Sequence, residues 1–137
     1  MKAILVDTQC LIAVTNLRDR GYAKARAEMT RLEQSGTRLV TTDAVLIEYC
    51  NALSKHQLRA RAIAMVKLLA TNPAFDVVHV TKEIYARSFG LYSNRPDKDW
   101  GLTDCISFEV LRERKLKQAL TIDFHFQQAG FEALLGE

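Results

Sequence analysis

The chain has 137 residues, of which 48% are hydrophobic, and this size and composition suit one folded domain. Its formal net charge of +3 is mildly basic, which permits nucleic-acid binding without requiring it. No apolar run approaches the roughly 20 residues of a membrane-spanning helix, and the amino terminus reaches Asp7 too early for a signal peptide. We therefore expect a single domain over residues 1–137, located in the cytoplasm and without a membrane partner.

The three cysteines are odd in number, and each lies in an apolar context: Cys10, Cys50 and Cys105. A disulfide framework is not expected from such a set. No Cys-x-x-Cys or closely spaced Cys/His pair indicates a thiolate metal site. We predict three buried free thiols.

The first half of the chain alternates short apolar runs with helical patterns. Residues 3–6 predict a buried parallel strand that ends at Asp7. Apolar residues at helical spacing predict a helix over 11–17 and, after Gly21, another over 23–34. The elements predicted next are a strand at 38–41, a helix capped by Thr42 or Asp43 that extends to Leu53, and a helix at 58–70.

The second half repeats this alternation and adds one polar loop. Thr81 is the predicted N-cap of a helix that ends at about Tyr92, and residues 93–99 have the composition of a loop. Asp104 is predicted to open the next helix, which ends in a basic turn. The other elements predicted here are strands at 75–80, 118–122 and 131–134 and a short helix at 124–128.

Strands that alternate with helices indicate an α/β fold. We expect a central, mostly parallel sheet of four to five strands with helices on both faces. No repeat, low-complexity tract or linker marks a second domain. In such a sheet, ligands bind beyond the carboxyl ends of the strands, where loops from different strands meet.

Four acidic residues lie at this edge of the predicted sheet or at nearby helix starts. Asp7 and Asp123 each follow a strand directly. Glu48 lies about one turn into a helix that follows a strand, and Asp104 follows the polar loop. Two such charges about 4 Å apart repel by about 4 kcal/mol at an effective dielectric near 20. Mg²⁺ or Mn²⁺ would reverse this repulsion, and a pair of such ions supports in-line displacement at phosphorus.

Each acid also has an ordinary structural explanation. Asp7 could cap the first helix, and Asp104 could be a charge that the helix dipole favours. Glu48 could be an exposed helix position, and Asp123 could cap a turn. The residues alone leave both explanations open, although the structural one would have to hold at all four positions.

Four short motifs contain these acids. They are Val6-Asp7-Thr8, Glu48, Leu102-Thr103-Asp104-Cys105, and Leu120-Thr121-Ile122-Asp123-Phe124-His125-Phe126 with the following Ala129-Gly130-Phe131. Their order and spacing resemble the PIN-domain ribonuclease family, and most closely the VapC-type toxins of prokaryotic toxin–antitoxin modules. The resemblance covers essentially the whole chain.

The resemblance implies a PIN-like fold and an endoribonuclease that depends on Mg²⁺ or Mn²⁺. The catalytic, metal-binding acids would be Asp7, Glu48, Asp104 and Asp123. Thr8 and Thr121 would be supporting hydroxyls near the metal. Gln9 stands where family members often have Ser, so that position receives no role.

Other residues near the acids carry weaker predictions. Asp99 is either a supporting acid or an ordinary turn residue. His125 is interpreted as a packing or hydrogen-bonding residue, and Trp100 as an anchor of its loop rather than a platform for a base. The candidate contacts to an RNA backbone are Arg95, Lys98 and Lys55.

Three other classes of protein compete with this hypothesis. A receiver-type phospho-accepting signalling domain shares the length and the α/β pattern, but Asp7 has no adjacent acid and no Lys follows Ile122. A haloacid-dehalogenase-like phosphatase needs a second Asp two residues after Asp7, and the chain has Gln9 there. The third is a non-catalytic module that binds RNA or protein, against which the presence of four acids argues.

The resemblance also implies partners. They are an RNA substrate, a cognate antitoxin with a segment that inserts across the acidic groove, and a second copy in a homodimer. The apolar helices after Gly21 and after Leu58 are candidate dimer surfaces, although core packing explains the same stripes.

Overall fold

The computed structural model describes residues 2–136, apart from the side chain of His56. Strands and helices alternate within this range. The strands are β1 (Ala3–Val6), β2 (Arg38–Thr42), β3 (Phe75–Val78), β4 (Gln118–Leu120) and β5 (Glu132–Ala133). The helices are α1 (Thr8–Thr15), α2 (Tyr22–Gln34), α3 (Asp43–Ala52), α4 (His56–Thr71), α5 (Lys82–Asn94), α6 (Leu102–Glu113) and α7 (Phe124–Gln128).

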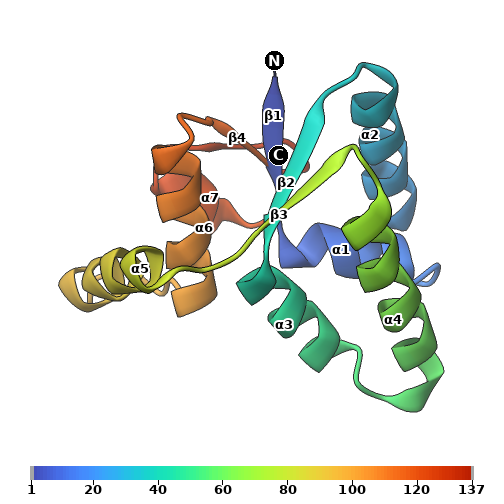
Figure 1. Cartoon of the computed structure of the whole chain (residues 1–137), viewed down its shortest axis with the longest axis horizontal. Helices are drawn as coiled ribbons and strands as arrows, with labels where there is room; N and C mark the ends of the chain where they lie inside the picture. The colour runs from blue at the N-terminus through green and yellow to red at the C-terminus, as the bar shows by residue number, and fades with distance from the viewer. Residues whose placement is uncertain (1, 137) are drawn as a thin grey trace.

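The described strands form one sheet in the order β3-β2-β1-β4-β5, and all four neighbouring pairs are parallel. The predicted α/β class is confirmed, and the sheet is wholly rather than mostly parallel. The chain builds β2 and β3 on one side of β1 and then places β4 and β5 on the other. The carboxyl ends of β1 and β4 therefore flank the point where the strand order reverses, which is where open α/β sheets bind ligands. Figure 1 shows β1 leading into α1 and β2 into α3 at this edge.

Alternation along β1 separates two layers of core. Ile4 and Val6 pack with buried residues of α1, α2, α3 and α4. Leu5 packs on the opposite face with buried residues of α5, α6 and α7. This alternation is expected of a strand that is buried on both faces. In Figure 1 the two groups of helices lie on opposite sides of the sheet.

The hydroxyl caps of two helices agree with the sequence. Thr42 accepts a hydrogen bond from the N–H of Val45 at 3.0 Å, and Thr81 accepts one from Ile84 at 3.1 Å. Thr42 rather than Asp43 therefore caps α3. Asp43 instead accepts the N–H of Val80 at 3.0 Å. Because that N–H is used outside the sheet, β3 ends at Val78 rather than at residue 80 as predicted.

Other boundaries also differ from those predicted. Helix α1 begins three residues earlier than expected and ends at Thr15, which leaves Leu17 62% exposed. Strand β4 ends at Leu120 rather than at Ile122, whose side chain is 60% exposed. Helix α6 begins at Leu102, so Asp104 is its third residue rather than its first.

The prediction of three buried thiols is wrong at one position. Cys10 and Cys105 are buried, but Cys50 is exposed. Position 50 follows the inward-facing Tyr49 on α3 and therefore points away from the core. Among the helices described, none is both long enough and apolar enough to cross a bilayer.

Candidate functional site

Asp7 lies at the carboxyl end of the central strand β1 and is only 3% exposed. Its backbone N–H donates to the carbonyl oxygen of Leu120 at 3.3 Å, which continues the β1–β4 pairing to the edge of the sheet. Asp7 precedes α1, but its side chain makes no capping hydrogen bond. Its Oδ2 instead accepts a hydrogen bond from the Thr121 hydroxyl at 2.9 Å. Helix capping therefore does not account for this carboxylate.

Thr121 connects the two acids that follow strands. Its side chain is fully buried, and its hydroxyl donates to Asp7 while accepting the backbone N–H of Asp123 at 3.0 Å. One hydroxyl thus holds a carboxylate from β1 and the backbone that follows β4. The orientation of Thr121 is fixed by both bonds, so it sets where the two acids lie.

Asp104 reaches the same place from α6. Its side chain is 17% exposed, and its Oδ2 accepts the N–H of Gly101, the N-cap of α6, at 3.1 Å. This contact and the helix dipole both favour a negative charge at this position. Asp104 thus also has the ordinary structural role considered in the sequence analysis, that of an acid at the start of a helix. The same oxygen also lies 3.4 Å from Nδ1 of His125.

Asp123 and His125 complete the group. Asp123 Oδ1 accepts the backbone N–H of His125 at 2.9 Å, which caps the short helix α7. The same oxygen lies 3.3 Å from His125 Nδ1. One ligand atom from each of Asp104, Asp123 and His125 lies within 4.8 Å of the others, so these three residues could share a metal ion.

The pKa values of Asp7 and Asp104 are both raised. Burial raises the pKa of Asp7 to about 7, the backbone N–H of Thr8 and the hydroxyl of Thr121 oppose this rise, and the charges of Asp104 and Asp123 add to it. Burial also raises the pKa of Asp104; the Gly101 N–H and His125 lower it, and the charge of Asp123 raises it. The surroundings of Asp7 and Asp104 therefore disfavour their charged forms. A bound cation relieves this condition.

Three buried side-chain atoms have no hydrogen-bond partner in the described part of the chain: Thr8 Oγ1, Ser107 Oγ and His125 Nδ1. Thr8 and His125 belong to the acidic motifs, and Ser107 lies just after one of them. Thr8 follows Asp7, Ser107 lies one helical turn beyond Asp104, and His125 lies two residues beyond Asp123. Buried polar atoms are usually paired, and of these three His125 Nδ1 is the one that lies beside the acids.

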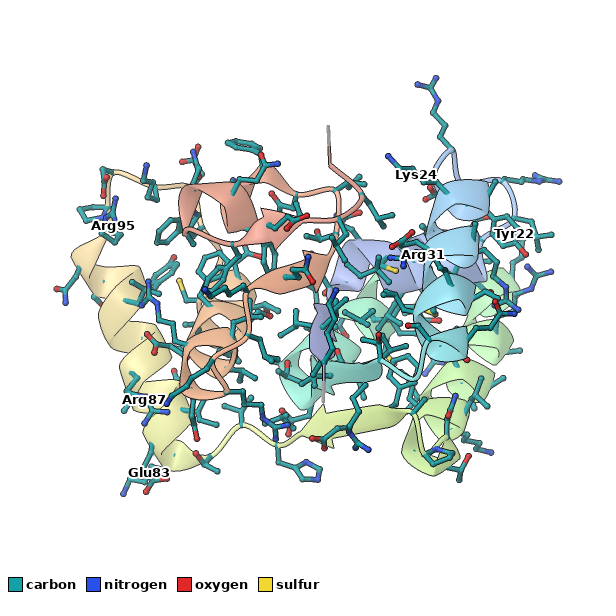
Figure 2. The ribbon with its side chains drawn as sticks, turned by 90° about the horizontal axis from the view of Figure 1, so that it is seen from above. Tyr22, Lys24, Arg31, Glu83, Arg87 and Arg95 are labelled. Atoms are coloured by element: carbon teal, nitrogen blue, oxygen red, sulfur yellow. The ribbon has the colours of Figure 1, made fainter. Side chains whose placement is uncertain are left out.

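A small, mostly apolar pocket of about 140 Å³ is lined by sequence neighbours of two of the acids. Its lining includes Gln9, two residues beyond Asp7, and Ile122, which precedes Asp123. Arg20 and Lys24 also line it, and Figure 2 labels Lys24 on α2. Asp19 lines the same pocket, so its rim carries charges of both signs.

Comparison with known proteins identifies this arrangement. The sequence profile of the PIN domain matches residues 4–132 of the chain. The chain belongs to the PIN domain family.

Individual relatives agree with this assignment. The protein named 23S rRNA-specific endonuclease VapC20 of Mycobacterium tuberculosis is 24% identical over 128 residues, which are 93% of this chain and 95% of VapC20. The crystal structure of the M. tuberculosis VapC20, described as a sarcin–ricin loop cleaving toxin, matches with a TM-score of 0.82 at 26% identity and the same coverage. VapBC2 from Rickettsia felis, bound to a DNA fragment from its promoter, matches with a TM-score of 0.68 at 11% identity over 96% of each chain. At that identity the likeness concerns the fold alone.

Glu48 is the predicted acid that this PIN domain does not bring to the centre. It is exposed on α3, where Val45 and Tyr49 take the buried positions. Its carboxylate has no hydrogen bond or ion pair within residues 2–136. The side chain that lies with those of Asp104 and Asp123 is instead His125.

The loop between α5 and α6 is held mainly by its own residues. Arg95, labelled at the end of α5 in Figure 2, donates to both carboxylate oxygens of Asp97 at 3.0 Å. Its guanidinium also lies 5.2 Å from the ring centre of Trp100. Trp100 is 5% exposed and donates to Gln128 at 3.0 Å, which confirms that it anchors the loop. Asp99 is exposed and lines a shallow hollow on this loop with Lys98.

Proposed function

We propose that this PIN domain is a divalent-metal-dependent endoribonuclease centred on Asp7, Asp104 and Asp123. The observation that carries the proposal is the convergence of three carboxylates from β1, α6 and the end of β4 in a mostly buried place. Asp7 is held by the Thr121 hydroxyl, which follows the neighbouring strand β4, whereas Asp104 and Asp123 each accept a backbone N–H from the start of their own helix. Three close carboxylates destabilise the folded protein when no cation is bound. Such a cluster is expected where a cation is needed for function.

The residues present fit Mg²⁺ or Mn²⁺, because both ions take carboxylate oxygens and water as ligands. When bound, such an ion lowers the pKa of a coordinated water and stabilises negative charge on a phosphodiester. Asp7, Asp104 and Asp123 would hold it. Thr121 would keep Asp7 in place, and the Thr8 and Ser107 hydroxyls would be available to coordinated water. No Ser, Cys or His nucleophile is required for this chemistry.

Glu48 remains in the proposal as the fourth acid. Its helix α3 begins directly after β2 at the same edge of the sheet, and its carboxylate is free to turn. Glu48 would join the other three acids only when metal or substrate is bound to the protein. Asp99 is not included among the proposed catalytic acids, because its side chain is exposed on the loop between α5 and α6.

RNA is the proposed substrate, and positive side chains around the centre would contact its phosphates. Lys98 and Lys55 are available for this role, whereas Arg95 is already engaged by Asp97 and Trp100. The M. tuberculosis relative carries 23S rRNA in its name, so ribosomal RNA is the first substrate to test.

The similarity to VapC20 and to VapBC complexes supports a toxin of a cytoplasmic toxin–antitoxin pair, with an antitoxin as partner.

A homodimer also belongs to the proposal. Helix α2 is not its surface, because the apolar residues Ala25, Met29 and Leu32 of this helix are in the core. Helix α4 retains exposed Ile63 and Leu68, and α5 exposes an aromatic row of Tyr85, Phe89 and Tyr92.

The receiver-type alternative does not fit the topology. Receiver domains have the strand order 2-1-3-4-5, with the third strand beside the first. Here β2 lies between β3 and β1. The acids therefore sit at a different switch point from the receiver's phosphorylation site.

The proposal is tested with purified protein and total cellular RNA in Mg²⁺, in Mn²⁺ and in EDTA, followed by mapping of the new RNA ends. We expect discrete cleavage with either metal and none in EDTA. A protein that binds RNA but leaves it intact under all three conditions would show a non-catalytic module. Cleavage that persists in EDTA would remove the metal from the proposal.

A further inference from the structure

His125 is held beside the acids by its own backbone. Its N–H donates to Asp123 Oδ1 at 2.9 Å, and the following Phe126 is fully buried against Phe108 with ring centres 5.0 Å apart. The ring of Phe124 lies 4.9 Å from the imidazole. The side chain of His125 is 20% exposed. The imidazole position is therefore set by α7 and does not depend on a bond made by the ring itself.

The ring atom that faces the acids is Nδ1. It lies 3.3 Å from Asp123 Oδ1 and 3.4 Å from Asp104 Oδ2. It is buried, yet it makes no hydrogen bond of acceptable geometry with either oxygen. Two ligand atoms on adjacent positions of an octahedral ion with bonds of about 2.1 Å are about 3 Å apart. The two distances from Nδ1 are thus close to those between adjacent ligands on one ion.

We propose that His125 is a nitrogen ligand of the metal held by Asp104 and Asp123, giving the centre a mixed oxygen and nitrogen donor set. The inference rests on the metal-dependent function proposed above. Imidazole suits transition metals, whereas Mg²⁺ prefers oxygen ligands. The centre therefore favours Mn²⁺ over Mg²⁺ more strongly than carboxylates alone would.

The first test is electron spin echo spectroscopy of the parent protein loaded with Mn²⁺. A directly bound imidazole nitrogen couples to the Mn²⁺ spin, and we expect this ¹⁴N coupling in the parent. It should be absent from His125→Phe, which keeps an aromatic ring at the position. Mn²⁺ bound to the parent without ¹⁴N coupling would overturn the inference, and this measurement does not require any variant to fold.

Titration calorimetry gives an independent measure. We expect His125→Phe to weaken Mn²⁺ binding by about tenfold or more, the range seen when groups that tune a metal site are removed, and to change Mg²⁺ binding less. His79→Phe is the matched control, because His79 also lies 3.3 Å from a carboxylate but is 86% exposed. Equal Mn²⁺ affinity in the parent and His125→Phe would overturn the inference.

The two proposals fail in distinguishable ways. RNA cleavage with Mn²⁺ but without ¹⁴N coupling would retain the nuclease and reject His125 as a ligand. A parent protein that binds no Mn²⁺ at millimolar concentration would reject both.

Discussion

Two carboxylate–imidazole pairs stand at the carboxyl edge of the sheet, one at each side of its centre. Asp43 and His79 follow β2 and β3, and Asp123 and His125 follow β4. The closest distance is 3.3 Å in both pairs. The exposure differs: 38% and 86% for the side chains of Asp43 and His79, against 24% and 20% for those of Asp123 and His125.

The difference lies in what else each carboxylate meets. Asp43 accepts the N–H of Val80, contacts the exposed His79 and is itself partly exposed, so water reaches its charge. Asp123 shares a mostly buried place with Asp7 and Asp104. A short carboxylate–histidine distance is therefore not enough to identify a metal centre. Burial together with several unneutralised acids makes the β1/β4 end different from the β2/β3 end.

The largest expected effect is on catalysis. Asp104→Asn should lower the rate of RNA cleavage at saturating Mg²⁺ by at least about 100-fold, because it removes a charged oxygen ligand of the metal that stabilises the negative charge developing on the phosphodiester. The matched change at the other pair, Asp43→Asn, should leave the rate within error of the parent. Circular dichroism checks that both variants are folded. Equal losses of cleavage rate in Asp104→Asn and Asp43→Asn would show that the two carboxylate–imidazole pairs do not differ in function.

An intermediate effect is expected at Thr121. Thr121→Val keeps the shape but removes the hydroxyl that donates to Asp7 and accepts from Asp123. Leaving these buried groups unpaired should cost about 1–3 kcal/mol of unfolding free energy in urea titrations. Cleavage should fall as well, because both acids lose their common support. The exposed Thr71, which bonds only within α4, supplies the control Thr71→Val; a Thr121→Val protein as stable and active as this control would contradict the role of Thr121.

The smallest effect concerns pH and the metal-free protein. The pKa of Asp7 is about 7 in the folded state against an ordinary value of 3.8, so the folded state binds this proton more tightly. The resulting stabilisation is fully present below about pH 4 and is lost as the pH rises through about 7. Asp7→Asn has no such loss. At pH 8 in EDTA it should melt a few degrees above the parent.

This difference should shrink as the pH falls towards 4, and scanning calorimetry across pH 4–8 measures it. Mn²⁺ should raise the melting temperature of the parent more than that of Asp7→Asn. A melting-temperature difference that does not vary with pH would show that Asp7 does not titrate in this range.

Much of the fold follows from local sequence patterns. The strands before Asp7 and Asp123 are short apolar runs that end at a charge, and the helices carry apolar spacing and hydroxyl caps such as Thr81. The ends of β3 and β4 were predicted two residues too long. There the apolar pattern continues through Val80 and Ile122, but their backbones leave the sheet. An apolar pattern shows which side chains are hydrophobic. It does not show whether their backbone groups make hydrogen bonds within the sheet.

The site was predictable where position depends on the sheet. Asp7 and Asp123 converge because parallel strands place their carboxyl ends together, and Asp104 joins them from the start of α6. Glu48 depends instead on the rotation of α3, which its neighbours set by burying Val45 and Tyr49. His125 was assigned a packing or hydrogen-bonding role, because a histidine two residues after an acid gives no sign that Nδ1 also lies 3.4 Å from Asp104.

Anomalous diffraction at the manganese edge from crystals soaked in Mn²⁺ tests the central claim most directly. We predict a peak among Asp7, Asp104 and Asp123, in contact with at least two of their carboxylates. The Asp43–His79 pair should show no peak. The absence of any peak among the three acids at millimolar Mn²⁺, or a peak at Asp43 and His79 alone, would contradict the account.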